Sequence, residues 1–208
     1  MARVPTAVLI SGRGSNFSAL HAASLVPDYP ADIALVIANR ADAPGLGLAR
    51  AAGVPTAVIE HRAFGRDRGK FDAALDATLR DRGIALVALA GFMRVLTEHF
   101  VTAWQDRLVN IHPSLLPAFP GLDTHARALA AGVRLHGATV HLVRPEVDSG
   151  PILAQAAVPV LPSDTEASLA ARVLAVEHRI YPMALAALAS GRAPAAASAD
   201  AALINPAA

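Results

Sequence analysis

Residues 110–117 of this 208-residue sequence carry side chains suited to acid–base chemistry on a carbonyl group. They read Asn-Ile-His-Pro-Ser-Leu-Leu-Pro and begin at the end of an apolar run of strand length. Because side chains alternate along a strand, Asn110 and His112 point to the same side, where a carboxamide and an imidazole can act on one group. A lone histidine is more often structural, but the prolines predict a rigid loop at a strand end, where sites of α/β proteins lie.

A possible partner for His112 lies in residues 144–151, which read Arg-Pro-Glu-Val-Asp-Ser-Gly-Pro. Taken alone, Asp148 fits an Asx-type turn with a solvated carboxylate. Beside His112, the same carboxylate would orient the imidazole and fix its tautomer. The spacing in the sequence does not bring the two residues together, so both interpretations stay open at this point.

Residues 11–16, Ser-Gly-Arg-Gly-Ser-Asn, stand between an apolar run and a segment of helical composition. The two glycines permit a tight turn, Ser15 or Asn16 can cap the helix, and free N–H groups there favour an anion such as phosphate. A plain capped turn explains this segment equally well. A dinucleotide site would place a small residue at Phe17 and an acid near Arg40, so NAD is disfavoured and an NADP enzyme is a minor alternative.

The elements that must position these residues are predicted from apolar runs and helical segments that alternate along the chain. The expected strands cover residues 7–10, 33–38, 56–59, 84–90, 109–112, 137–143 and 152–160, the last two paired with each other. The expected helices include one that runs to about residue 25, then 71–82 and 166–189, with a shaped loop over 113–123. Strands that are apolar on both faces predict an α/β fold, an open and mostly parallel sheet with helices on both faces.

Composition excludes several classes of function. Eighteen basic and seventeen acidic side chains give a net charge of +1, which argues against nucleic acid or an anionic membrane as partner and favours a small molecule. The sequence contains no cysteine, which excludes disulfides and thiolate chemistry, and a cytoplasmic location is expected. The histidines form no pattern of metal ligands, so no metal is expected. No signal peptide and no apolar run long enough to span a membrane is found.

Five motifs in order resemble the folate-dependent phosphoribosylglycinamide formyltransferase family. The motifs are residues 11–16, 90–94, 110–117, 120–125 with Pro-Gly and Thr-His, and 148–151 with Asp-x-Gly-Pro. The resemblance covers roughly residues 5–190. It implies a Rossmann-like formyltransferase fold in one domain over residues 1–192. Residues 193–208 are rich in Ala, Pro and Ser without periodicity, which predicts a disordered tail.

The resemblance also implies an activity, the transfer of a formyl group from 10-formyltetrahydrofolate to the amine of glycinamide ribonucleotide in purine biosynthesis. Formyl-folate is then the cosubstrate, and both partners are small molecules. Apart from the resemblance, the expected state is a monomer or a homodimer, because no stripe on the predicted surface favours one of them. The catalytic residues that the family match implies are Asn110, His112 and Asp148. Donors aimed at the oxygen of the tetrahedral intermediate stabilise its developing charge, a role expected for Asn110 and protonated His112.

Binding residues follow from the same match. For glycinamide ribonucleotide and its phosphate they are Gly14, Ser15, Asn16, Phe17 and Glu177. For the folate they are Arg68, Met93, Arg94, Val95, Leu96, Asn110, Arg144, Pro145, Glu146, Val147 and Asp148. The chain departs from the family at Asp123, where histidine is common, and at Arg13 and Phe17 in the phosphate turn.

Other interpretations remain open. A 10-formyltetrahydrofolate hydrolase would carry a regulatory domain ahead of this one, and a methionyl-tRNA formyltransferase would carry a further C-terminal domain, neither of which is expected here. Another formyltransferase of the same fold would share the trio. A binding protein that kept the phosphate turn but lost the chemistry is disfavoured because Asn110, His112 and Asp148 are all present.

Overall fold

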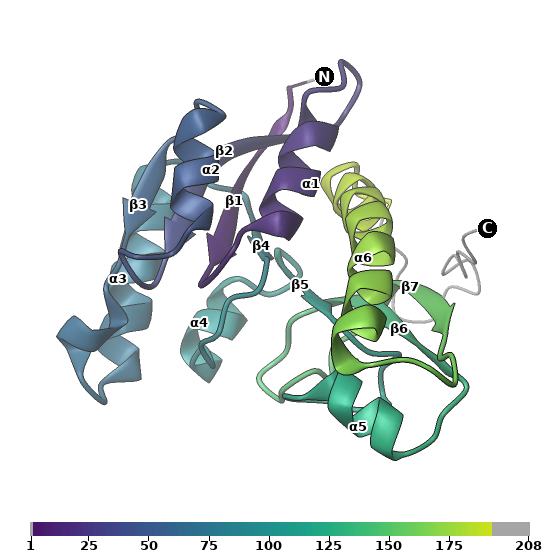
Figure 1. Ribbon diagram of the computed structural model, residues 1–208. Helices are drawn as coiled ribbons and strands as arrows, with labels where there is room; N and C mark the ends of the chain where they lie inside the picture. Colours follow the sequence, from purple (N-terminus) through teal and green to yellow (C-terminus); the bar gives the residue numbers. More distant parts are fainter. Residues whose placement is uncertain (1, 193–208) are drawn as a thin grey trace.

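The computed structural model describes residues 2–192, which form one twisted sheet of seven strands with helices packed on both sides (Figure 1). The strands are β1 (Val4–Ile10), β2 (Ala31–Ala38), β3 (Thr56–Val58), β4 (Leu86–Leu89), β5 (Leu108–His112), β6 (Leu135–Leu142) and β7 (Ile152–Pro159). Their order across the sheet is β3-β2-β1-β4-β5-β6-β7. The first five strands pair in parallel, and β6 and β7 add two antiparallel pairings.

The helices divide between the two faces of the sheet. They are α1 (Ser15–Ser24), α2 (Gly45–Ala51), the 3-10 turn η1 (His61–Phe64), α3 (Arg68–Asp81), α4 (Glu98–Ala103), α5 (Thr124–Ala130) and α6 (Glu166–Ala189). Buried residues of α1, α2, α5 and α6 join one core cluster, and those of α3 and α4 join the other. No helix in this part of the chain is long and apolar enough to cross a membrane.

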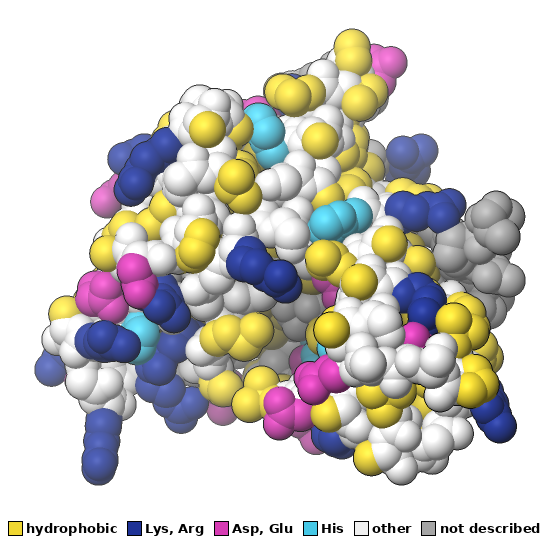
Figure 2. All heavy atoms as spheres, in the orientation of Figure 1, with side chains coloured by type: hydrophobic (Ala, Val, Ile, Leu, Met, Phe, Trp, Pro, Cys, Tyr) yellow, Lys and Arg dark blue, Asp and Glu magenta, His cyan; other side chains and the backbone are white. Residues whose placement is uncertain are grey.

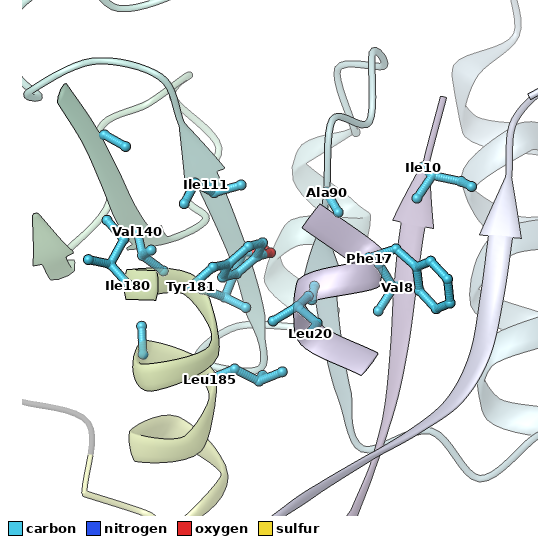
Figure 3. Packing of buried hydrophobic residues seen from close by; sticks show 14 of the residues in the cluster. Val8, Ile10, Phe17, Leu20, Ala90, Ile111, Val140, Ile180, Tyr181 and Leu185 are labelled. Atoms are coloured by element: carbon cyan, nitrogen blue, oxygen red, sulfur yellow. The ribbon is translucent and has the colours of Figure 1, made fainter. Parts of the chain in front are cut away.

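Strand β1 shows why the sheet is covered on both sides. Val8 and Ile10 belong to the core cluster beneath α1 and α6, while Ala7 and Leu9 belong to the cluster beneath α3 and α4. Both faces therefore exclude water, as continuous apolar strands of a parallel sheet require. Figure 3 shows the first cluster, in which Tyr181 of α6 reaches between α1 and β5.

Strand order places the functional segments at one edge. The chain runs from β1 outward to β3, then returns to β4 on the other side of β1, so the topology switches between β1 and β4. The carboxyl ends of parallel strands meet at the same edge, and ligands of open α/β sheets bind where the order switches. The turn after β1, the segment after β4 and His112 at the end of β5 all lie there.

The sequence-based prediction of the fold is confirmed. Each of the seven strands agrees with its predicted range to within three residues at either end, β6 and β7 pair as expected, and α6 has the predicted bounds. Helix α3 starts earlier than predicted, because Asp67 caps it by accepting a hydrogen bond from the Lys70 backbone N–H. The predicted tail over residues 193–208 lies outside the described residues.

Gly137 in β6 leaves no room for a side chain against β7. A Cβ at this position would collide with the backbone oxygen of Ala156 on β7. We expect Gly137→Ala to lower the free energy of unfolding by about 1–3 kcal/mol, as overpacking commonly does. Urea denaturation measures this.

The matched control is Gly47→Ala in α2, where, apart from the adjacent backbone of the helix itself, no atom of residues 2–192 lies within 4 Å of the added Cβ. Alanine favours a helix over glycine, so this variant should be more stable by about 0.5–1 kcal/mol. Equal unfolding free energies for the two variants would contradict the account of the β6–β7 contact.

Candidate active site

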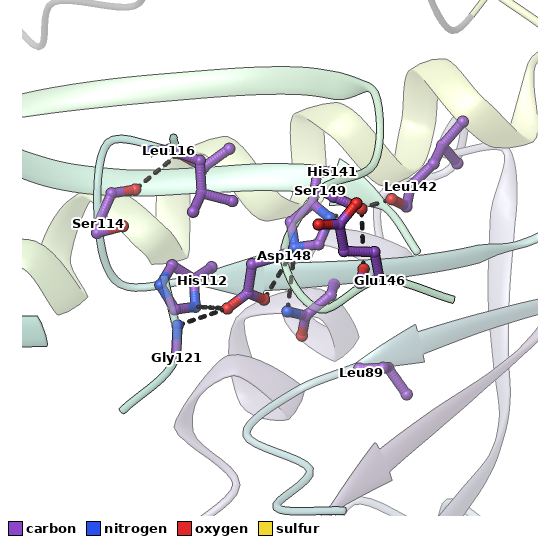
Figure 4. Close-up of polar contacts among 12 residues, drawn as sticks. Leu89, His112, Ser114, Leu116, Gly121, His141, Leu142, Glu146, Asp148 and Ser149 are labelled. Carbon is purple, nitrogen blue, oxygen red and sulfur yellow. Dashed lines mark hydrogen bonds and ion pairs between the residues drawn. The ribbon is translucent and has the colours of Figure 1, made fainter. Parts of the chain in front are cut away.

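Asn110, His112 and Asp148 converge at the carboxyl edge of the sheet. Figure 4 shows Asp148 beside His112 and His141. Asn110 and His112 lie on β5, and Asp148 arrives from the loop between β6 and β7. The Nδ1 atom of His112 lies 3.4 Å from Oδ2 of Asp148, and both side chains are at least nine-tenths buried. The same carboxylate oxygen accepts a hydrogen bond of 2.8 Å from the backbone N–H of Gly121. The carboxylate is therefore held beside the imidazole, 36 positions away in the sequence.

The second ring nitrogen of His112 also faces an acceptor. Nε2 lies 3.0 Å from the backbone oxygen of Phe119. Phe119 has φ 53°, a left-handed conformation that a bulky residue rarely adopts. The structure thus differs from the sequence-based expectation, because both nitrogens of His112 are engaged and neither points freely at a reacting oxygen. The physical reason is the loop after β5, which folds back over the ring.

The loop over residues 113–123 is fixed by polar contacts to the neighbouring strands. The hydroxyl of Thr139 on β6 donates to the Ser114 carbonyl at 2.7 Å and accepts from the Leu116 N–H at 3.0 Å. Gln155 on β7 donates to the Leu116 carbonyl at 2.8 Å and to the Thr139 hydroxyl at 3.0 Å. These contacts hold the loop in place, and with it the Phe119 carbonyl that faces His112.

Asp148 reaches the site because its loop turns sharply back toward β6. Gly150 packs so closely on the carbonyl of Leu142 that a Cβ at this position would collide with it. Asp148 itself has φ 54°, and Arg144 at the start of the loop binds Asp106 at 2.6 Å. The remaining loop residues of the predicted folate set, Pro145, Glu146 and Val147, are exposed.

In the turn after β1, the backbone packs closely against the backbone of α2. Gly14 has φ 79°, and a Cβ there would lie 2.8 Å from the Cα of Gly45 in α2. The predicted side-chain cap by Ser15 or Asn16 is wrong, since Gly14 is the N-cap and makes no side-chain cap bond. Both residues lie inside the first turn of α1.

Asn16 contacts α6 in place of capping its own helix. Its Nδ2 donates to Oε2 of Glu177 at 2.7 Å, which joins two of the predicted substrate residues across 161 positions. Burial raises the pKa of the Glu177 carboxyl, and the hydrogen bond from Asn16 opposes this shift. The Oδ1 atom of Asn16 is buried and has no hydrogen-bond partner among the described residues.

The segment after β4 lies against the turn after β1. The N–H of Met93 donates to the hydroxyl of Ser11 at 2.8 Å. Met93 and Val95 are 68% and 54% exposed, large values for apolar side chains, whereas Leu96 is buried in the core beside α3. The guanidinium of Arg94 lies 5.8 Å from the ring centre of Phe71, and its buried Nε has no partner among the described residues.

Figure 2 shows a hollow in the middle of this face, between the surface over α1 and α4 and the surface over α5 and α6. Hydrophobic, basic and acidic side chains border it. Among residues 2–192, no group of three or more His, Cys, Asp or Glu side chains is arranged to hold a metal ion.

Two of the predicted binding residues are not brought to this site by any contact that the structure shows. Arg68 is exposed in the first turn of α3, and no side-chain hydrogen bond within the described chain links it to the trio. The ring of Phe17 is 1% exposed in the core, so only its backbone can face a ligand. Both assignments remain predictions.

The roles of several residues that shape the site could not be derived from the sequence. Gly121 and Phe119 act through backbone atoms, so their side-chain types carry no information about the role. His141 lies opposite Asn110 in the β5–β6 register, a pairing that only the folded sheet defines. Gly150 stands in the Asp-x-Gly-Pro string of the sequence, but its close approach to the Leu142 carbonyl is defined only by the folded loop.

Comparison with known proteins decides the family. The model of the family described as Formyl transferase matches residues 4–185. This chain belongs to the formyl transferase family. The phosphoribosylglycinamide formyltransferase of Escherichia coli is 44% identical over 185 residues, which cover 89% of this chain and 87% of that protein. The corresponding protein of Haemophilus influenzae is 42% identical over 186 residues, 89% of this chain and 87% of that protein.

The formyl transferase also resembles part of a larger protein. The human trifunctional purine biosynthetic protein adenosine-3 is 49% identical over 185 residues, which cover 89% of this chain but 18% of that protein. The chain therefore spans about a fifth of the length of such trifunctional relatives.

Solved structures agree with the fold of this formyl transferase. The phosphoribosylglycinamide formyltransferase of Brucella melitensis gives a TM-score of 0.86 at 49% identity, over 91% of this chain and 97% of that one. Glycinamide ribonucleotide transformylase 1 from Symbiobacterium toebii gives 0.88 at 48% identity, over 91% and 89% of the two chains.

The buried Glu177 carboxyl should destabilise the formyl transferase at neutral pH. Because its pKa is raised, the folded state holds this proton more tightly than the unfolded state, so stability falls as pH rises through the titration range. Glu177→Gln keeps an acceptor for Asn16 but carries no charge. We expect this variant to be more stable than the wild type at pH 7 by on the order of 1 kcal/mol, in urea denaturation.

At a pH below about 4, where the wild-type carboxyl is protonated in both states, the difference should disappear. Glu177→Leu serves as the control, because it leaves the Asn16 amide without its acceptor and should cost about 1–3 kcal/mol. An advantage of Glu177→Gln that is the same at both pH values would show that the charge is not its source.

Proposed function

We propose that this formyl transferase transfers the formyl group of 10-formyltetrahydrofolate to the amine of glycinamide ribonucleotide, as the names of its bacterial relatives describe. The single observation that carries the proposal is the convergence of Asn110, His112 and Asp148 at the carboxyl ends of the strands, beside the switch between β1 and β4. The trio supplies a donor, an imidazole and a carboxylate, the groups that transfer of an acyl unit to an amine requires.

Glycinamide ribonucleotide would bind at the turn after β1. Gly14, Ser15 and the backbone of Phe17 lie at the N-terminus of α1, where unpaired N–H groups and the helix dipole favour a phosphate. The Oδ1 atom of Asn16, which has no hydrogen-bond partner within residues 2–192, and the carboxyl of Glu177 are available for N–H and O–H donors of the glycinamide or ribose. Hydrogen bonds to the substrate would satisfy the buried polar atoms of Asn16 and Glu177, which accounts for this polar pair in a buried position.

The folate would lie between the segment after β4 and the loop before β7. Met93 and Val95 offer exposed apolar surface to a flat heterocycle, while Arg94 has a buried Nε that lacks a partner among the described residues. Arg144, Pro145, Glu146 and Val147 would enclose it from the other side. Arg68 remains the predicted folate contact with the least support.

In the reaction, the amine nitrogen bonds to the formyl carbon, the bond from that carbon to N10 of the folate breaks, and one proton moves from the amine to N10. The tetrahedral intermediate carries a negative oxygen, to which Asn110 Nδ2 can donate a hydrogen bond. Within the described chain, the one side-chain partner of this nitrogen is Nε2 of His141 at 3.2 Å, which leaves a second hydrogen for the oxygen. His112 is held between the Asp148 carboxylate and the Phe119 carbonyl, and in its protonated form the ring places a positive charge beside this oxygen. Asp148, whose Oδ1 accepts no hydrogen bond from the described residues, can pass the proton on through water.

The proposal includes a cytoplasmic location, in keeping with the absence of cysteine from the sequence, and a monomeric or homodimeric state. It requires no metal ion.

Replacing either Asn110, the proposed donor to the oxyanion, or His112, whose ring lies beside it, should nearly abolish turnover. We expect Asn110→Ala and His112→Ala each to lower kcat about 10²–10³-fold, the usual loss for one oxyanion donor. The measurement is release of tetrahydrofolate from 10-formyltetrahydrofolate, with and without glycinamide ribonucleotide. His99→Ala, an exposed histidine of α4, is the control and should keep the wild-type rate.

The same assay separates the alternatives. Release that depends on the amine supports transfer, whereas release without the amine would identify a hydrolase. No release with either substrate set, or an Asn110→Ala variant with the wild-type kcat, would refute the proposal.

A further inference from the structure

His141 lies directly opposite the proposed oxyanion donor. In the antiparallel register of β5 and β6, Asn110 pairs with His141, so both side chains project from the same face of the sheet. The Nε2 atom of His141 lies 3.2 Å from Nδ2 of Asn110, and the histidine is 2% exposed. A buried imidazole in contact with a proposed donor, and without a role in the chemistry described above, calls for an explanation.

The other ring nitrogen defines how His141 can interact. Nδ1 lies 3.0 Å from the carbonyl oxygen of Leu142, and a carbonyl can only accept, so Nδ1 carries the hydrogen. A neutral imidazole then has a lone pair on Nε2, which accepts a hydrogen from Nδ2 of Asn110. Burial lowers the pKa of the His141 imidazole, which keeps it in this neutral form.

Two titratable groups face His141. Oδ1 of Asp148 lies 3.7 Å from Nε2, too far for a hydrogen bond, and the charge of His112 also acts on the ring. Protonated His112 opposes a second positive charge on His141, while Asp148 favours it. Because an unprotonated Nε2 of His141 has no hydrogen to donate, the Asp148 carboxylate interacts with the His112 ring and the Gly121 N–H instead.

We propose that His141 is a positioning residue that fixes the rotation of the Asn110 side-chain amide. By accepting one hydrogen of Nδ2, His141 holds the amide nitrogen of Asn110, and not the amide oxygen, next to its own ring. The second hydrogen of Nδ2 then remains free to bond to the reacting oxygen. An amide turned by a half-rotation would present Oδ1 there and repel a developing negative charge. The inference rests on the role of Asn110 in the proposed function.

A double-mutant cycle tests this coupling. His141→Leu removes the acceptor, and we expect kcat to fall about tenfold with KM little changed, the range for residues in direct contact. His141→Gln keeps both an acceptor and a donor, and should retain most of the wild-type kcat. In an Asn110→Ala background, His141→Leu should cause no further loss, because the amide that it positions is gone.

The results separate failure of this inference from failure of the proposed function. If Asn110→Ala keeps the wild-type kcat, Asn110 is not the donor, and the proposed function and the inference about His141 both fail. An impaired Asn110→Ala variant that loses a further tenfold on His141→Leu would overturn the inference alone, since the effect would then be structural.

A second measurement does not depend on how the variants fold. Nitrogen-15 NMR of the wild-type histidine rings reports which ring nitrogen carries hydrogen. We expect Nε2 of His141 to be unprotonated and Nδ1 to carry the hydrogen at neutral pH. A hydrogen on Nε2 would overturn the inference.

Discussion

The approach of the Asp148 carboxylate to the His112 imidazole is the contact on which the rest of the site depends. Two elements of different kinds produce it, the end of a buried parallel strand and a loop that returns from an antiparallel pair. Burial of both side chains strengthens their attraction, because little water competes at the 3.4 Å separation. The Gly121 N–H fixes the carboxylate, and the Phe119 carbonyl fixes the far side of the ring.

The sheet supplies a second constraint, which brings two binding surfaces to this point. Turns after β1 and β4 lie on either side of the topological switch and are joined by the bond from Met93 to Ser11. Helix α6 reaches the same edge through Glu177 and its bond with Asn16. A phosphate-bearing amine and a formyl donor can therefore approach the trio from different sides, which allows the reacting atoms to be oriented before the bond forms.

Local patterns in the sequence were sufficient to predict the layers of the fold. Successive residues of β1 are all apolar because Val8 and Ile10 pack on one face of the sheet and Ala7 and Leu9 on the other. Local patterns also placed Asn110 and His112 on one side of β5. The position of Asp148 could not be derived from the residues, since it depends on how β6 and β7 fold back, and was given by family resemblance. Asn16 illustrates the limit: as a local cap it was predicted wrongly, because its partner Glu177 lies on a distant helix.

The most direct test of the central claim is a crystal structure with glycinamide ribonucleotide and a folate analogue whose formyl group cannot be transferred. The account predicts the phosphate at the N-terminus of α1 and the formyl oxygen within hydrogen-bond distance of Asn110 Nδ2, beside His112. A formyl group bound away from both side chains, with the trio unchanged, would contradict it.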